Sequence, residues 1–110
     1  MTTPAAHERH AEALEEAVFR APALTPPELR QQVGARASGG VAIAAPYDAL
    51  ARQIGEAAYG VTDAQVAEVL AATGSQKAAF EIVAAAGVGA ALRRWKAGLG
   101  ALREASDAAR

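Results

Sequence analysis

The stretch FEIVAAAGVGAALRRW, at residues 80–95, decides the fold of this chain. Eleven residues without a polar side chain separate Glu81 from Arg93, and most of them are alanine or glycine. Larger apolar side chains recur every three or four positions from Phe80 through Trp95 to Leu102. This periodicity predicts one long helix with a continuous face toward a core.

Small residues on the other faces of this helix predict close contact with another helix. Ala85 and Gly89 are four residues apart, as are Gly87 and Ala91. Side chains of this size let two helix backbones approach each other. Glycine inside a helix costs about 0.5–1 kcal/mol relative to alanine, so packing contacts must compensate. We therefore expect these four residues to form an interface, in part between subunits.

Capping residues and helix breakers predict four shorter helices before residue 75, and so an all-α fold of about five helices. Pro22 and Gly34 end the first two, because proline and glycine disfavour helix interiors. In VTDAQV, residues 61–66, Thr62 and Gln65 form a capping box, and Gly74 ends that helix. The other expected helix starts are the caps Thr3, Thr25 and Ser75 and the opening proline Pro46.

The length of 110 residues predicts a single domain, which we divide into three segments. N-terminal helices occupy residues 1–34, a glycine-containing linker occupies 35–45, and a helical core occupies 46–110. At the start of that core, Asp48 and Arg52 are one helical turn apart and are expected to form an ion pair.

The composition excludes several classes of function. The net charge of −1 argues against a nucleic-acid surface, which needs a basic patch. The absence of cysteine excludes disulfides and thiolate chemistry. The longest uncharged run, 82–92, spans about 16 Å, whereas a membrane helix needs about 20 residues. We therefore expect a cytoplasmic protein without a membrane partner, and its arginine and alanine usage is typical of a GC-rich bacterium.

The core is expected to be thin. Alanine accounts for 32 residues, and only 25 residues are both large and apolar. A buried alanine removes far less surface from water than a buried leucine, which stabilises a fold by about 1.5–3 kcal/mol. Contacts between subunits of a homo-oligomer are therefore expected to supply part of the stability.

Glu81, beside Phe80 at the start of the apolar run, has two interpretations. A half-buried carboxyl would have a raised pKa and would suit proton transfer. A first-turn carboxylate would simply interact with the helix dipole, and we favour this second interpretation.

Trp95 directly follows Arg93 and Arg94, which allows an anion-binding site at this end of the apolar run. The favoured alternative is a solvated helix end with the indole in the core. His7 and His10 have no third ligand at a suitable spacing, so we predict no metal site and no cofactor.

From about Tyr47 to Leu102 the chain resembles the C-terminal part of the alkylhydroperoxidase D-like / carboxymuconolactone decarboxylase family. The resemblance rests on AAYGVTDAQVAEVLAATGSQKAAFEIVAAAGVGAALRRWKAGL, residues 57–99, and covers about half of the chain. The positions that match the family pattern are Asp63, Gly74, Glu81 and Arg93 or Arg94.

This resemblance implies an all-α bundle of intertwined subunits, as a dimer, trimer or hexamer or with a related family subunit. Peroxidase members use a Cys-x-x-Cys pair, which this chain lacks, so thiol peroxidase activity is excluded. The main hypothesis is a non-catalytic or accessory member that acts as a helical oligomer, a partner subunit or a small-molecule binder. The alternative is a redox-independent decarboxylase- or isomerase-type enzyme for a small organic acid. In that enzyme Glu81 and Tyr47 would transfer protons, and Arg93 or Arg94 would hold the carboxylate beside Trp95.

Overall fold

The computed structural model describes residues 4–109, and all regular structure in that range is helical. The prediction of an all-α chain with about five helices is thereby confirmed, while the expected cap Thr3 lies outside the described residues. No helix within residues 4–109 is both long and apolar enough to cross a membrane. The elements are α1 (Pro4–Glu15), η1 (Glu16–Arg20, a π-helical turn), α2 (Pro27–Ala37), α3 (Tyr47–Ala57), η2 (Ala58–Gly60, a 3-10 turn), α4 (Asp63–Thr73) and α5 (Gln76–Ala108).

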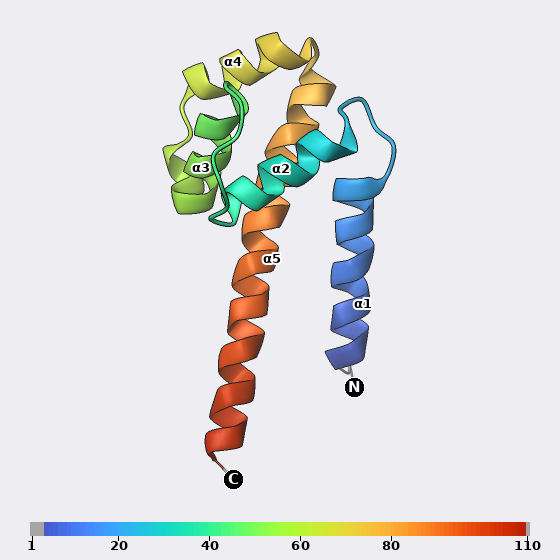
Figure 1. The fold of residues 1–110 in the computed structure, drawn as a ribbon, viewed down its shortest axis with the longest axis vertical. Helices are drawn as coiled ribbons and strands as arrows, with labels where there is room; N and C mark the ends of the chain where they lie inside the picture. Colours follow the sequence, from blue (N-terminus) through green and yellow to red (C-terminus); the bar gives the residue numbers. More distant parts are fainter. Residues whose placement is uncertain (1–3, 110) are drawn as a thin grey trace.

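The helices form a body and a stem (Figure 1). In the body, α2, α3 and α4 gather around the N-terminal half of α5. The stem consists of α1 and residues 93–108 of α5, which run beside each other beyond the body. With 33 residues, α5 is about 50 Å long, close to the longest dimension of the molecule, 54 Å.

The core lies in the body, and each of its four helices contributes one fully buried large side chain. Val33 of α2, Leu50 of α3, Val69 of α4 and Ile82 of α5 are fully buried. Most of the other core members are alanines, so the core is thin in this single chain, as expected from the composition.

The face that α5 presents to the core differs from the predicted one. Phe80 and Leu102 of the predicted stripe are each 68% exposed, whereas Ala85 is fully buried. The reason is a close crossing with α2: a methyl group on Gly89 would lie 2.4 Å from the carbonyl oxygen of Gly34. Only small side chains permit this approach, so the small-residue face is the one that packs against the body.

The close helix contact expected between subunits is therefore made within one chain at Ala85 and Gly89. Both residues lie where α2 covers α5. Gly87 and Ala91 face the other way: Ala91 is exposed, and a methyl group on Gly87 would have no atom within 4 Å.

Two of the predicted caps are correct and one is wrong. Thr62 and Gln65 form the reciprocal capping box of α4, and Ser75 accepts a hydrogen bond from the Ala78 amide at the start of α5. Gly74 ends α4 with a φ of 85°, in the left-handed region that glycine tolerates. Thr25 does not cap α2, whose N-cap is Pro26, because its side chain is engaged elsewhere.

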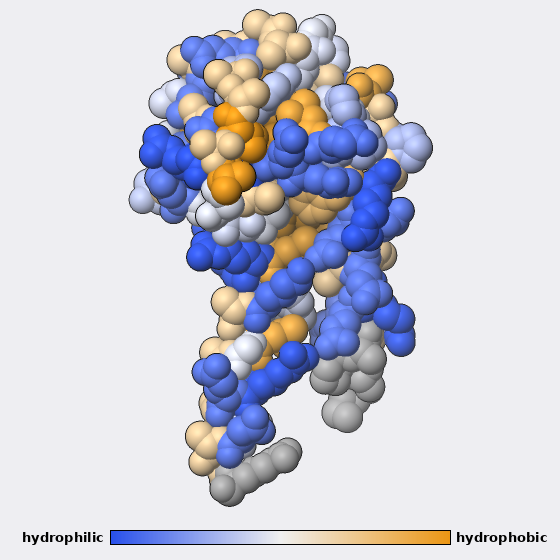
Figure 2. All heavy atoms as spheres, viewed as in Figure 1, coloured by the Kyte–Doolittle hydropathy of each residue, from blue (hydrophilic) through white to orange (hydrophobic). Residues whose placement is uncertain are grey.

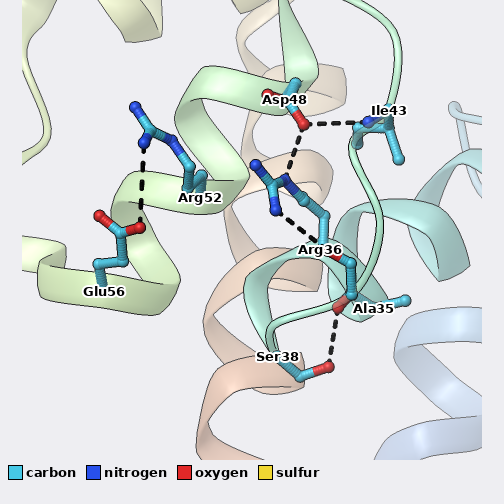
Figure 3. Close-up of polar contacts among 8 residues, drawn as sticks. Ala35, Arg36, Ser38, Ile43, Asp48, Arg52 and Glu56 are labelled. Atoms are coloured by element: carbon cyan, nitrogen blue, oxygen red, sulfur yellow. Dashed lines mark hydrogen bonds and ion pairs between the residues drawn. The ribbon is translucent and has the colours of Figure 1, made fainter.

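The predicted linker begins too early, since α2 continues through Ala37 and the irregular segment is 38–46. The extra turn lets Arg36 reach Asp48 at 2.7 Å, in place of the expected Arg52 (Figure 3). Asp48 also accepts a hydrogen bond of 2.9 Å from the Ile43 amide. The hydrogen bond from that amide, and then the one from the Arg36 side chain, hold the pKa of Asp48 below its ordinary value. These two contacts tie the loop to α2 and α3.

Candidate functional site

A groove of about 600 Å³ opens between η1, α2 and α5, where the stem meets the body; we call it the upper groove. The end of α1 adds a side chain to its wall. The lining combines an apolar part and a polar part of similar extent. The apolar members are Phe19, Gly34, Ala35, Gly89 and Leu92, and the polar members are Glu15, Arg20, Gln31, Ser38, Arg93 and Lys96.

The apolar part of the upper groove follows from the same two glycines that allow α2 and α5 to cross. A methyl group on Gly34 would lie 2.4 Å from the ring of Phe19, so the ring rests directly on the backbone of α2. Phe19 belongs to η1, the π-helical turn that continues α1. Such turns are rare in proteins, and those that occur often lie at functional sites.

The polar part of the upper groove carries three cations and one carboxylate. Two of the cations are engaged: Lys96 lies 3.1 Å from Glu15, and Arg20 lies 3.1 Å from Glu16. Arg93 has no hydrogen bond or ion pair among the residues that the structure describes. Its guanidinium lies beside Gly39, where an added methyl group would be 3.8 Å away. An anion in the groove can therefore bind Arg93 without displacing an internal partner.

A polar cluster of the buried Thr25 and Arg30 with the partly buried Glu81, which we call the polar anchor, holds η1 and the following loop to the body. The Glu81 carboxylate accepts hydrogen bonds from the Thr25 hydroxyl at 2.7 Å and the Thr25 amide at 2.8 Å. It also accepts one from the Leu24 amide at 3.1 Å. Arg30, only 2% exposed, donates to the backbone carbonyls of Val18 and Ala21.

The polar anchor explains the ionisation of Glu81. Burial alone raises the pKa of this carboxyl. The hydrogen bonds from Thr25 and Leu24 and the charge of Arg30 more than offset that effect, and the pKa lies below its ordinary value. Glu81 is therefore ionised at neutral pH with its oxygens engaged, which gives it a different role from both sequence interpretations: it binds backbone amides of another segment.

Tyr47, the other predicted catalytic residue, lies at the start of α3 and packs partly buried against the core. It lines neither the upper groove nor the smaller groove described below, and no hydrogen bond connects it with Glu81 among residues 4–109. The structure thus gives these two residues separate surroundings.

The predicted ligand-binding residues of α5 point to different places. Arg93 lines the upper groove, whereas Arg94 donates a hydrogen bond of 2.9 Å to the Gly55 carbonyl on α3. Trp95 is 38% exposed, so it is not a core residue, and its ring centre lies 5.8 Å from that of His7. Of the three, only Arg93 lies in the upper groove.

Trp95 belongs instead to a groove of about 330 Å³ between the two helices of the stem, which we call the lower groove. Glu15 and Lys96 line both grooves, and the ion pair between these two side chains lies where the grooves meet. Within the part of the chain that the structure covers, no group of three or more His, Asp or Glu side chains is placed to hold a metal ion. The remaining residues of the lower groove are Glu8, Ala11, Glu12, Leu99 and Arg103.

Sequence reasoning missed the upper groove residues Phe19, Gln31 and Ser38. Their spacing along the chain gives no local signal, because they meet only when η1 folds onto α2. The sequence signal for this groove was Arg93, the charged residue that ends the apolar run of α5.

Comparison with protein-family models, with curated proteins and with solved structures finds no match to this chain. The chemical evidence on function therefore comes from the two grooves and their charges.

Proposed function

We propose that this chain is a non-catalytic member of the alkylhydroperoxidase D-like / carboxymuconolactone decarboxylase family that binds a small organic acid in the upper groove. The observation that carries the proposal is Arg93, which lines an open, half-apolar groove and has no partner among the described residues. A ligand with one carboxylate and an apolar body matches both parts of the lining. The cap Thr62 at the start of α4 and the turn from Gly74 to Ser75 between α4 and α5 support the family assignment.

The charges of the upper groove select an anion over a cation or a neutral molecule. Arg93 supplies an unpaired guanidinium, and the Gln31 side-chain amide, which donates one hydrogen to the Phe19 carbonyl at 3.0 Å, keeps a second hydrogen for a carboxylate. Phe19 and Leu92 provide the apolar surface for the rest of the ligand.

The proposal is tested by titrating the protein with benzoate and, as the uncharged match, with benzamide, while amide shifts are followed by NMR. We expect benzoate to shift the amides of Gln31, Ser38 and Arg93, and benzamide to bind more weakly. A charge-assisted hydrogen bond contributes about 1.5–3 kcal/mol, so Arg93→Gln should weaken benzoate binding about 10- to 100-fold.

Arg94→Gln is the matched control, because it removes the same charge from the neighbouring residue, which contacts α3 instead. It should change the benzoate dissociation constant less than about twofold, as expected for a screened charge outside the groove. Equal weakening by the two variants would show that the protein attracts anions through its general charge. Equal binding of benzoate and benzamide would show that the carboxylate is not recognised, and either result would refute a site at Arg93.

A further inference from the structure

The stem exposes several large apolar side chains. Leu102 is 68% exposed, Leu14 is 43% exposed and Trp95 is 38% exposed. In Figure 2 the two helices of the stem stand apart below the body, with apolar surface on the side of α5 that faces α1. The contacts that bridge the two helices are polar or aromatic: Lys96 with Glu15, Arg103 with Glu8, and the ring contact of His7 with Trp95.

The chain also has more surface than a compact monomer of its mass. Its accessible surface is 6954 Å², whereas a folded monomer of 11.2 kDa has about 5,700 Å². Its radius of gyration is 15.6 Å, compared with about 13 Å for a compact domain of this length. The excess of roughly 1,200 Å² exceeds the area of about 800 Å² that each partner buries in a standard protein interface.

The part of α5 in the stem has weak support within its own chain. It contains Gly98 and Gly100, and a methyl group on either would have no atom within 4 Å. Isolated helices of about 15 residues are marginal in water even without glycine. Contacts from outside the chain would supply the missing support.

The two helices of the stem carry opposite charge. Within α1, three carboxylates (Glu8, Glu12 and Glu15) outnumber one arginine. Within residues 93–108, four cations outnumber Glu104 and Asp107. Two stems placed around a two-fold axis, with α1 of each copy next to α5 of the other, would alternate acidic and basic helices around a four-helix bundle.

We propose that the stem docks onto the stem of a second copy of this chain and forms a two-fold symmetric four-helix bundle that covers Trp95 and Leu102. Closed two-fold pairs use the same surface on both copies, and the alternating charges favour this arrangement over one that pairs like helices. The pairing leaves the core of the body unchanged and does not depend on ligand binding in the upper groove.

The first test is the mass in solution of the full chain, by light scattering and sedimentation at protein concentrations from about 1 to 100 μM, the range of micromolar association. The expected mass is twice the chain mass of 11.2 kDa at the upper concentration. A mass of one chain throughout, or of three or more chains, would overturn a two-fold pairing.

Leu102→Asp tests the surface itself. Since Leu102 is exposed in the single chain, the variant should keep its helical circular dichroism, and its dimer dissociation constant should rise at least about tenfold. Val41→Asp is the control, because Val41 is 85% exposed on the body and the change is chemically the same. Unchanged association of Leu102→Asp, or equal loss in both variants, would place the contact elsewhere and refute the proposal.

A spin label locates the contact when the chain does associate. With Ala101→Cys labelled in one copy and nitrogen-15 in the other, broadening should fall on α1 and on residues 93–108 of the unlabelled copy. Broadening confined to α3 and α4 would mean that the body mediates association, and would overturn the stem assignment.

Discussion

The crossing of α2 and α5 makes a sharp prediction for two glycines of the same helix. A methyl group at position 89 would lie 2.4, 2.6 and 2.8 Å from the oxygen, Cα and carbonyl carbon of Gly34. Because all three are backbone atoms, the contact is relieved only by moving the helices apart by about 1 Å, a distortion of the kind produced by overpacking a core. Gly87→Ala places the same methyl group where no atom lies within 4 Å.

Gly89→Ala should lower the free energy of unfolding by about 1–2 kcal/mol. Overpacking costs about 1–3 kcal/mol, and replacing glycine inside a helix returns about 0.5–1 kcal/mol. Gly87→Ala has only the second effect and should stabilise the protein by about 0.5–1 kcal/mol. In thermal unfolding, Gly89→Ala should lose about 4–10 °C and Gly87→Ala should gain a few degrees.

The comparison is made by denaturant titration of both variants and the parent at the same low protein concentration, followed by circular dichroism. The two variants have the same chemistry on the same helix, so their difference isolates the contact with Gly34. If Gly89→Ala is at least as stable as Gly87→Ala, the helices do not approach at this point and the reason given for the buried face of α5 is wrong.

The polar anchor leads to two further predictions. Glu81→Gln removes a carboxylate that accepts three hydrogen bonds and should lower the free energy of unfolding by about 1–3 kcal/mol. The control Glu28→Gln, on the exposed first turn of α2, should lower it by less than about 0.5 kcal/mol. Equal losses of the two variants in denaturant titration would contradict the anchor. Because the folded-state pKa values of Glu81 and Asp48 are lowered, their stabilisation is complete above the unfolded carboxyl pKa of about 4 and is lost as the pH falls through the lower folded values. The melting temperature should therefore fall on acidification below about pH 5, less steeply in Glu81→Gln, and identical pH profiles for the two proteins would refute this assignment.

Local signals in the sequence predicted the helices and most of their ends. The capping box of Thr62 and Gln65 and the cap Ser75 depend on atoms within three residues of each other, so the sequence specifies them directly. The failure at Thr25 has a physical reason: its hydroxyl donates to Glu81, fifty-six positions further along the chain. No local pattern contains that partner.

The buried face of α5 was not predictable from periodicity alone, because alanine and glycine make its N-terminal half nearly apolar all round. Which face is buried depends on Gly34 of α2, which selects the small side chains opposite it. Arg30, by contrast, gave a signal that was not used: it lies three residues before Val33 and seven before Ala37, on the buried face of α2. A charged residue at such a position indicates a paired or anchored side chain.

The attachment of α1 and η1 has a consequence for how ligands reach the upper groove. Among their described residues none is fully buried, and a few polar contacts together with the partly buried Val18 and Phe19 hold the segment to the rest of the chain. A segment held in this way opens at a lower free energy than the core. Since Glu15, Phe19 and Arg20 form one wall of the groove, each opening removes that wall. A bound acid would therefore slow amide hydrogen exchange in α1, even at residues that never touch it.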